Sequence, residues 1–243
     1  MSDCIVIIPS YNPNNNLLDL LTDITFLTNY KIIIVNDGST VNEYIFDHCK
    51  KYAIVLNHKS NLGKGSAIKT ALAYIHSTIT TPINIVIIDS DGQHKVNDMI
   101  NIFNTLSNNL DSLILGSRCF KGKIPLRSKI GNITTSFIFK NATGLKIKDT
   151  QTGLRGFNSN LLPLFMSVKG NRYEYEMNIL LECAKNKIRI IEVPIETIYI
   201  DDNKSSHFNP IKDSILIYKT IIKFVCSFVY TKINSLPKKR DSQ

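Results

Sequence analysis

Short apolar runs rich in isoleucine and valine alternate with helix-like segments through the first half of the chain. The apolar runs cover residues 4–8, 32–35, 53–56 and 83–88. The segments that follow them repeat apolar side chains at helical spacing and cover residues 17–27, 42–51, 67–76 and 96–106. Runs of β-branched apolar residues are typical of strands that are buried on both faces of a parallel sheet. This alternation predicts an α/β domain with a doubly wound, mostly parallel sheet.

The rest of the chain is expected to complete this domain up to residue 210 and to form a separate C-terminal segment after it. Further strands are predicted at residues 112–115 and 188–193, further helices at 130–142 and 173–185, and a polar segment at 149–157. The sequence shows no long linker and no internal repeat, so we expect one domain over residues 1–210. Residues 211–243 are expected to form an amphipathic helix and a basic tail.

Each predicted strand of the first half is followed by a loop of polar residues and glycine. These loops contain residues 9–12, 37–39, 63–65 and 89–91. The carboxyl ends of parallel strands lie at one edge of an α/β sheet, and ligands bind beyond that edge. We therefore expect the four loops to converge on one site.

The last of these loops, Asp89-Ser90-Asp91-Gly92-Gln93-His94, presents two carboxylates one residue apart. Mg²⁺ prefers oxygen ligands and is commonly held by one or two carboxylates together with substrate phosphates. The alternative is an ordinary turn, because Asp, Ser and Gly are all turn formers. An EF-hand does not fit, because glycine is fourth and glutamine is fifth in this loop. Convergence with the other loops favours the metal site.

The loop before the third predicted helix contains Gly63, Lys64 and Gly65. It is not a Walker P-loop, because the lysine precedes the second glycine and the upstream glycine is missing. It retains a glycine turn at the start of a helix, where free N–H groups and the helix dipole favour an anion. The alternative is a plain helix-entry turn.

The composition narrows the class of protein. The chain has 243 residues and a net charge of +9, which suits a polyanionic partner: nucleic acid, anionic lipid or a phosphorylated substrate. It contains no recognisable nucleic-acid-binding module, so no nucleic-acid partner is expected. Its cysteines are scattered, at positions 4, 49, 119, 183 and 226, which favours a reducing compartment over a disulfide scaffold. The N-terminus reads as a strand rather than a signal peptide.

Four motifs follow one another along the chain: Ile8-Pro9-Ser10-Tyr11-Asn12, Val35-Asn36-Asp37-Gly38-Ser39, Asn61-Leu62-Gly63-Lys64-Gly65-Ser66-Ala67 and Asp89-Ser90-Asp91. Taken in this order, they resemble the motifs of GT-A fold, family 2 glycosyltransferases. Downstream, Gly116-Ser117-Arg118, the segment 149–157 and Glu192-Val193-Pro194-Ile195 resemble the branch that acts on polyprenyl phosphates, such as dolichol-phosphate mannose and glucose synthases and their bacterial undecaprenyl-phosphate counterparts. The likeness covers roughly residues 4–210.

The resemblance implies a role for each matching position. The nucleotide-sugar site would comprise Pro9, Tyr11, Asn12, Asp37, Gly38, Ser39, Gly63, Lys64, Gly65, Asp89, Ser90, Asp91 and Arg118, with Asp37 accepting hydrogen bonds from the base. Asp89 and Asp91 would hold Mg²⁺ or Mn²⁺ on the diphosphate, with Gln93 as a further ligand. Arg127 and Arg155 would clamp the acceptor phosphate, since the guanidinium fork suits phosphate oxygens.

The implied reaction is attack of a lipid phosphate oxygen on the anomeric carbon, with inversion. The nucleophile is already an anion, which reduces the need for a general base. Asp91 and Asp149 are the expected catalytic residues, with Asp149 as base or orienter. Glu174 and Glu176 are alternatives or plain helix-surface charges, and His94 is either a metal ligand or a loop histidine without a role.

Departures from the family pattern sharpen the expectation. Pro13 stands where the first loop of the family often carries a glutamate, so this chain lacks that acid. The chain has no tryptophan and so lacks the Gln-x-x-Arg-Trp signature of processive synthases, which favours transfer of a single sugar. The Gly153-Leu154-Arg155-Gly156-Phe157 version of its motif favours UDP-glucose or UDP-N-acetylglucosamine as donor.

The C-terminal stretch is interrupted by Lys219 and Lys223, so it is not expected to span a membrane. It would either lie in the lipid interface or pack on protein. The expected location is the cytoplasm, peripheral on the inner face of the cell membrane, with a role in modifying cell-envelope glycans. Self-association and a separate flippase partner stay open. The alternatives are a family 2 transferase acting on a soluble glycan or glycolipid, and a membrane-bound nucleotide-sugar sensor.

Overall fold

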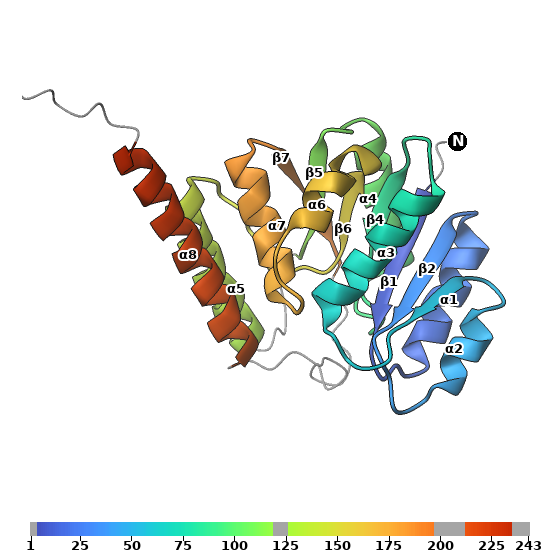
Figure 1. The fold of residues 1–243 in the computed structure, drawn as a ribbon. Coiled ribbons are helices and arrows are strands. Elements are labelled where there is room, and N and C mark those ends of the chain that lie inside the picture. Colours follow the sequence, from blue (N-terminus) through green and yellow to red (C-terminus); the bar gives the residue numbers. More distant parts are fainter. Residues whose placement is uncertain (1–3, 119–125, 197–211, 235–243) are drawn as a thin grey trace, which may run out of the picture.

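A seven-stranded mixed sheet forms the centre of the molecule (Figure 1). The computed structural model describes residues 4–118, 126–196 and 212–234, apart from the side chains of residues 126–128, 212 and 227–234. The strands are β1 (Cys4–Ser10), β2 (Lys31–Asn36), β3 (Ile54–Asn57), β4 (Asn84–Ile87), β5 (Ser112–Arg118), β6 (Arg155–Asn158) and β7 (Arg189–Ile195). Their order is β3-β2-β1-β4-β6-β5-β7, and only the pairings of β6 are antiparallel. The predicted doubly wound, mostly parallel α/β sheet is confirmed.

Helices cover both faces of the sheet. On one face lie α1 (Asn16–Leu27), α2 (Tyr44–Cys49) and α4 (Val96–Ser107). On the other lie α3 (Lys64–Thr78), α6 (Leu162–Ser167), which follows the short 3₁₀ turn Ser159–Leu161, and α7 (Glu174–Lys185). Successive side chains of a strand point to opposite faces. In β1, Val6 and Ile8 therefore enter the first core and Ile5 and Ile7 the second, which explains its unbroken apolar run.

Strand β6 is one that the apolar pattern does not predict. It begins with Arg155 and Gly156, which break the apolar run expected of a buried strand. Gly156 is needed for packing, because a Cβ there would come within 2.6 Å of Ile102 in α4. Since β6 runs antiparallel to β4, its first residue lies opposite Ile87, at the carboxyl end of β4. The segment just before β6 is thereby brought next to Asp89.

Helices α5 (Leu126–Thr143) and α8 (Lys212–Asn234) lie side by side at the β7 end of the molecule (Figure 1). Ile217 and Ile221 of α8 are buried in the same core as α7, whereas Lys219 and Lys223 are exposed. This part of α8 is amphipathic and packs on protein along its apolar side. The division at residue 210 stays a prediction. In the described ranges, every helix is too short or too polar to cross a membrane.

Candidate active site

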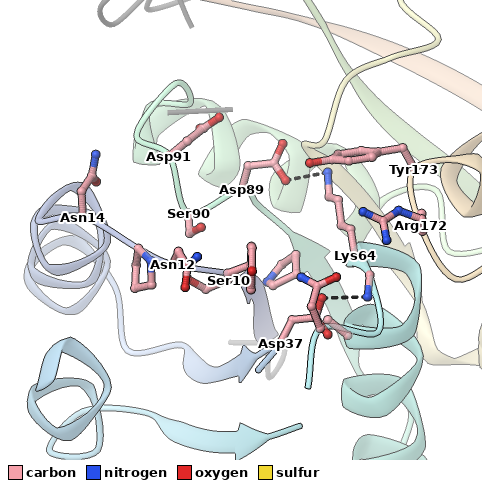
Figure 2. Close-up of a pocket in the computed structure, with 16 residues that line it drawn as sticks. Ser10, Asn12, Asn14, Asp37, Lys64, Asp89, Ser90, Asp91, Arg172 and Tyr173 are labelled. Carbon is pink, nitrogen blue, oxygen red and sulfur yellow. Dashed lines mark hydrogen bonds and ion pairs between the residues drawn. The ribbon is translucent and has the colours of Figure 1, made fainter. Parts of the chain in front are cut away.

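A cleft of about 520 Å³ opens beyond the carboxyl ends of β1, β2 and β4, beside the start of α3 (Figure 2). Its lining consists of Pro9, Ser10, Tyr11, Asn12, Pro13, Asn14, Asp37, Asn61, Gly63, Lys64, Ala67, Asp89, Ser90, Asp91, Arg172 and Tyr173. The loops that follow separate strands thus contribute to one cleft, as the strand-end argument requires.

Asp37 ties two of these loops together. Its carboxylate accepts hydrogen bonds from the backbone N–H of Leu62 at 2.9 Å and of Gly63 at 2.8 Å. It also lies 2.7 Å from Nδ1 of His58, whose side chain is 8% exposed. Asp37 therefore fixes the glycine loop that opens α3. The expected hydrogen bond from the nucleotide base to Asp37 stays a prediction. Asp37 would accept it in addition to the bonds that it already makes within the protein.

The loops after β1 and β2 are joined through Asn12 and Ser39. The Asn12 backbone N–H donates to Ser39 Oγ at 2.9 Å, and the Thr40 N–H donates to Asn12 Oδ1 at 2.9 Å. Gly38, which precedes Ser39, has φ +68°, and a Cβ there would come within 2.2 Å of the Ser60 backbone. Gly38 and Ser39 thus shape the cleft wall, while Asn12 lines the cleft.

The Asp89–Asp91 loop forms a turn, and both of its aspartates line the cleft. The Gln93 N–H donates to Asp91 Oδ1 at 3.0 Å, and Gly92 has φ +80°. Burial, together with the nearby negative charge of Asp89, raises the pKa of Asp91 to about 6. Burial opposes ionisation of Asp89, but its basic neighbours, Lys64 foremost, together outweigh burial and lower the pKa of that carboxyl.

Lys64 places a positive charge beside Asp89. Its Nζ lies 2.6 Å from Asp89 Oδ1 and 5.8 Å from the ring centre of Tyr173 (Figure 2). It also lies 3.1 Å from Glu176 Oε1. Burial would lower the pKa of Lys64, but the two carboxylates overcome it and raise that pKa. Lys64, at the start of α3, is therefore charged, and it neutralises part of the negative charge of Asp89 in the β4 loop and Glu176 in α7.

The donor set of this cleft fits a hard divalent cation. Asp89 and Asp91 offer carboxylate oxygens, the ligands that Mg²⁺ and Mn²⁺ prefer. Burial and then the negative charge of Asp89 raise the pKa of Asp91, and a dication would favour the ionised form of both carboxyls. Within the described residues, no three His, Cys, Asp or Glu side chains gather as a complete metal site. A cation here would thus need further oxygens, such as those of a bound diphosphate.

Asp89 rests directly on Gly153. A Cβ at position 153 would come within 2.0 Å of Asp89 Oδ2 and 2.7 Å of Oδ1. The segment before β6 thus forms the floor on which the carboxylate lies. His94 Nε2 is 3.9 Å from Asp89 Oδ2, and burial lowers the pKa of His94 to about 4, so this imidazole is neutral at pH 7.

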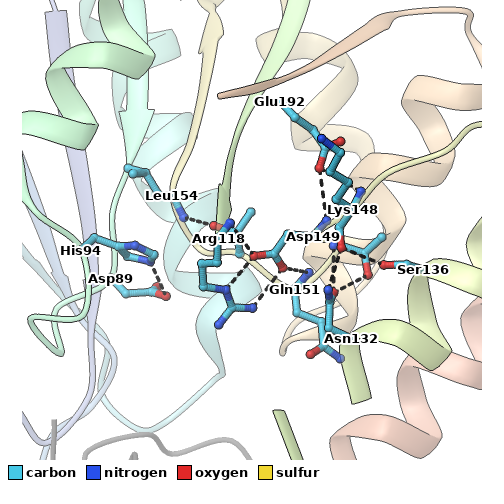
Figure 3. Close-up of polar contacts among 12 residues, drawn as sticks. Asp89, His94, Arg118, Asn132, Ser136, Lys148, Asp149, Gln151, Leu154 and Glu192 are labelled. Carbon is cyan, nitrogen blue, oxygen red and sulfur yellow. Dashed lines mark hydrogen bonds and ion pairs between the residues drawn. The ribbon is translucent and has the colours of Figure 1, made fainter. Parts of the chain in front are cut away.

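Arg118, at the end of β5, forms a two-point ion pair with Asp149 (Figure 3). Nε lies 2.6 Å from Oδ2 and Nη2 lies 3.0 Å from Oδ1. Asp149 is fully buried, and it also accepts from the backbone N–H groups of Arg118 and Gln151. The structure thus places Asp149 as a support for Arg118. Of the two roles expected for Asp149, the orienter fits this geometry.

Arg155 is placed differently from the expected phosphate clamp. The side chain is 1% exposed, and its guanidinium donates to the carbonyls of Thr152 at 2.9 Å and Glu176 at 2.7 Å. Its Nε is 3.7 Å from Glu176 Oε1. A guanidinium enclosed in this way is directed into the protein, so the expectation that Arg155 clamps the acceptor phosphate is corrected: it braces the segment before β6 against α7.

Two residues that the strand-end argument does not find, Arg172 and Tyr173, complete the cleft. They lie just before α7 and reach the cleft because Gly63 and Gly65 let that loop approach α3. A Cβ at Gly65 would meet Tyr175 at 2.5 Å, and the Ser66 N–H donates to Asn171 O. In the sequence, these two residues are marked only by the polar run 170–174 before a predicted helix. That this run lies next to α3 is a feature of the tertiary structure, which the sequence pattern does not predict.

The remaining predicted residues lie around this cleft. Arg118 and Gln93 do not line it, although Arg118 is near enough for its charge to affect the pKa of His94. The side chain of Arg127 lies outside the described part of the chain. Glu174 accepts from the backbone N–H of Asn171 and caps that loop.

A cleft at the ends of parallel strands, with paired carboxylates, a glycine loop and the basic residues Lys64 and Arg172, can hold a nucleotide diphosphate together with a divalent cation. The sequence agrees: the family model of Glycosyl transferase family 2 matches residues 5–163, and the chain belongs to that family. It is therefore a glycosyltransferase.

Two curated relatives narrow the comparison. A UDP-N-acetylglucosamine–dolichyl-phosphate N-acetylglucosaminyltransferase from Methanococcus voltae is 30% identical over 217 residues, with 81% of this chain and 86% of that protein covered. The dolichyl-phosphate β-glucosyltransferase of Saccharomyces cerevisiae is 26% identical over 232 residues, with 82% and 68% covered.

Among solved structures, glucosyl-3-phosphoglycerate synthase from Mycobacterium tuberculosis has the same fold. The TM-score is 0.69 at 16% identity, over 93% of this chain and 80% of that chain. That protein was crystallised with Mn²⁺, UDP-glucose and phosphoglyceric acid. At this identity the likeness shows the fold alone, and it confirms the GT-A expectation.

Proposed function

We propose that this glycosyltransferase moves a hexose from a nucleotide sugar to a polyprenyl phosphate at a membrane surface. The observation that carries the proposal is the cleft itself, where the carboxylates of Asp89 and Asp91 lie with two basic residues, Lys64 and Arg172. The relatives in Methanococcus voltae and yeast, whose names specify dolichyl phosphate, support the acceptor class. The preferred donors are UDP-glucose and UDP-N-acetylglucosamine, and undecaprenyl phosphate is the proposed lipid.

The donor half of the reaction uses the loops around the cleft. The base would lie by Pro9, Tyr11 and Asp37, and the diphosphate would lie between Lys64 and the carboxylate pair. Asp89 and Asp91 would hold Mg²⁺ or Mn²⁺, with Gln93 as a further ligand. A bound dication would neutralise the negative charge that develops on the leaving diphosphate.

The acceptor half uses a phosphate that is already ionised. One of its oxygens attacks the anomeric carbon, the bond from that carbon to the diphosphate breaks, and the configuration inverts. Arg118 lies at the carboxyl end of β5 with its fork fixed by Asp149 and its side chain 15% exposed, so it can present N–H groups to a phosphate. Arg172 on the cleft wall offers a second cation.

The outer faces of α5 and α8 suit a lipid surface. Ile130, Ile133 and Phe137 recur at helical spacing on α5 and are 57–66% exposed. On α8, Ile215 and Ile222 are exposed beside Lys219 and Lys223. Apolar side chains flanked by lysines bind the interface of anionic membranes. We place the protein peripherally on the cytoplasmic face of the cell membrane, where it would supply sugars for cell-envelope glycans.

A transfer assay tests the proposal. Purified protein is incubated with Mn²⁺, undecaprenyl phosphate and a panel of radiolabelled UDP- and GDP-sugars, and the lipid phase is counted. We expect label from UDP-glucose or UDP-N-acetylglucosamine to enter the lipid phase, and neither EDTA-treated protein nor Asp91→Ala to transfer it. Label on an added oligosaccharide, with none on the lipid, would instead support a transferase of soluble glycans.

A further inference from the structure

The Asp89 carboxylate already has a cation on it. Lys64 Nζ lies 2.6 Å from Asp89 Oδ1, at the distance of a strong charge-assisted hydrogen bond. The lysine side chain is only 13% exposed, so solvent does little to weaken the pair. The oxygen that a divalent cation would take is thus occupied by an ammonium group of the protein itself.

The carboxylate cannot withdraw from this contact to serve a metal elsewhere. Behind it lies Gly153, so close that a single added carbon would overlap Oδ2. His94 stands 3.9 Å from the same oxygen. An ammonium and a dication on one fixed carboxylate repel each other. A cation that binds Asp89 must therefore displace Lys64, and Asp89 does not move to meet it.

Lys64 can leave without stranding its second partner. Glu176 Oε1 lies 3.1 Å from Lys64 Nζ and also 3.7 Å from Arg155 Nε. Arg155 is held by the carbonyls of Thr152 and Glu176, so it remains in place. Glu176 therefore keeps a positive neighbour when the lysine moves.

The lysine also has somewhere to go. It is the first residue of α3 and lines the cleft, where the positive end of the helix dipole favours an anion over a cation. Its four-carbon stem is flexible, unlike a guanidinium fork. A diphosphate in the cleft would attract the ammonium group away from Asp89 as it brings its own oxygens to the metal.

We propose that Lys64 is an exchangeable counter-ion: it occupies Asp89 in the empty enzyme and passes to the nucleotide diphosphate when the divalent cation takes that carboxylate. This inference rests on the proposed donor site. Its consequence is synergy in binding. The metal binds weakly alone, because it must expel an ammonium group, and it binds tightly with nucleotide, because the diphosphate receives that group.

The test measures Mn²⁺ binding to the full chain by the electron paramagnetic resonance signal of free Mn²⁺, with and without UDP. Lys64→Met removes the ammonium group. We expect it to bind Mn²⁺ alone about tenfold more tightly than the wild type, and the enhancement by UDP to shrink about tenfold. Lys185→Met is the matched control, because Lys185 pairs with Glu182 on the surface and its loss changes the net charge equally. It should behave as the wild type.

Two further variants at position 64 separate the effect of the positive charge from effects of side-chain shape or misfolding. Lys64→Arg keeps the positive charge and should keep the weak binding of Mn²⁺ alone. Lys64→Gln serves as the neutral variant if thermal melting shows that Lys64→Met does not fold. Unchanged or weaker Mn²⁺ binding in the neutral variant would overturn the inference, as would a wild type that binds no Mn²⁺ with UDP present.

No acceptor takes part in these measurements. A failure to glycosylate polyprenyl phosphate would therefore refute the proposed acceptor and leave the exchange intact. Normal transfer with no change in Mn²⁺ binding would refute the exchange alone.

Discussion

Arg118 and Asp149 form a two-point ion pair, with Nε 2.6 Å from Oδ2 and Nη2 3.0 Å from Oδ1, although they lie on different segments. Asp149 is fully buried, so its charge depends on this partner and on the backbone N–H groups around it. Removing one member of a buried pair leaves the other uncompensated.

We expect Asp149→Asn to lower the free energy of unfolding by about 3 kcal/mol. It should also lower the rate of transfer about 100-fold, because Arg118 would lose its fixed direction. Denaturant unfolding and the transfer assay measure the two effects. Asp47→Asn, which breaks the exposed pair with Lys50, should change neither. A stable Asp149→Asn protein with full activity would contradict the positioning role.

The pKa of Asp91 predicts how stability depends on pH. An unfolded aspartate titrates near 3.8, whereas the folded Asp91 titrates near 6. Between these values the folded protein binds more protons than the unfolded chain, so stability falls as pH rises through this window. Ionised Asp91 then costs about 2–3 kcal/mol at pH 7.

Asp91→Asn should therefore raise the melting temperature of the metal-free protein at pH 7.5, and the gain should vanish near pH 4. Melting in EDTA at both values measures this difference. Mg²⁺ with UDP should stabilise the wild type and leave Asp91→Asn unaffected. An Asp91→Asn protein that melts below the wild type at pH 7.5 would show that the Asp91 carboxylate stabilises the metal-free fold, which contradicts this prediction.

Gly153 predicts a variant that damages the site without touching a charge. In Gly153→Ala the new methyl group would occupy the place of the Asp89 carboxylate, at 2.0 Å from Oδ2. We expect UDP-dependent Mn²⁺ binding to be lost, as measured by calorimetry. Gly131→Ala is the control, because its Cβ would approach only the Gln151 side chain, at 3.8 Å, and alanine suits a helix. Normal binding in Gly153→Ala would mean that Asp89 is free to shift.

The apolar face of α5 predicts membrane binding. Phe137→Glu places a charge where an aromatic side chain is 66% exposed, so sedimentation with vesicles of anionic lipid should fall about tenfold or more. Phe26→Glu on α1, where phenylalanine is 85% exposed on the opposite face of the sheet, should sediment as the wild type. Equal loss in both variants would point to a general effect of charge.

Much of the candidate site can be predicted from sequence because strand ends are local features. The loops at residues 9–12, 37–39, 63–65 and 89–91 each follow an apolar run, and parallel pairing places them on one edge without further information. Lys64 and Asp89 were both expected there. Their direct contact was not, because periodicity says nothing about where a flexible side chain rests.

The sequence by itself determined the alternation of strands and helices, the edge where the site lies and the family. Only the tertiary structure decided the roles of the second half. Because β6 is antiparallel, Gly153 packs against Asp89, Arg155 is buried against α7, and Asp149 lies within hydrogen-bond distance of Arg118. Because Gly63 and Gly65 carry no side chain, the loop with Arg172 and Tyr173 can pack against the start of α3 and line the cleft. These contacts join segments far apart in the chain, and close packing and the pairing of buried charges select them rather than any local pattern.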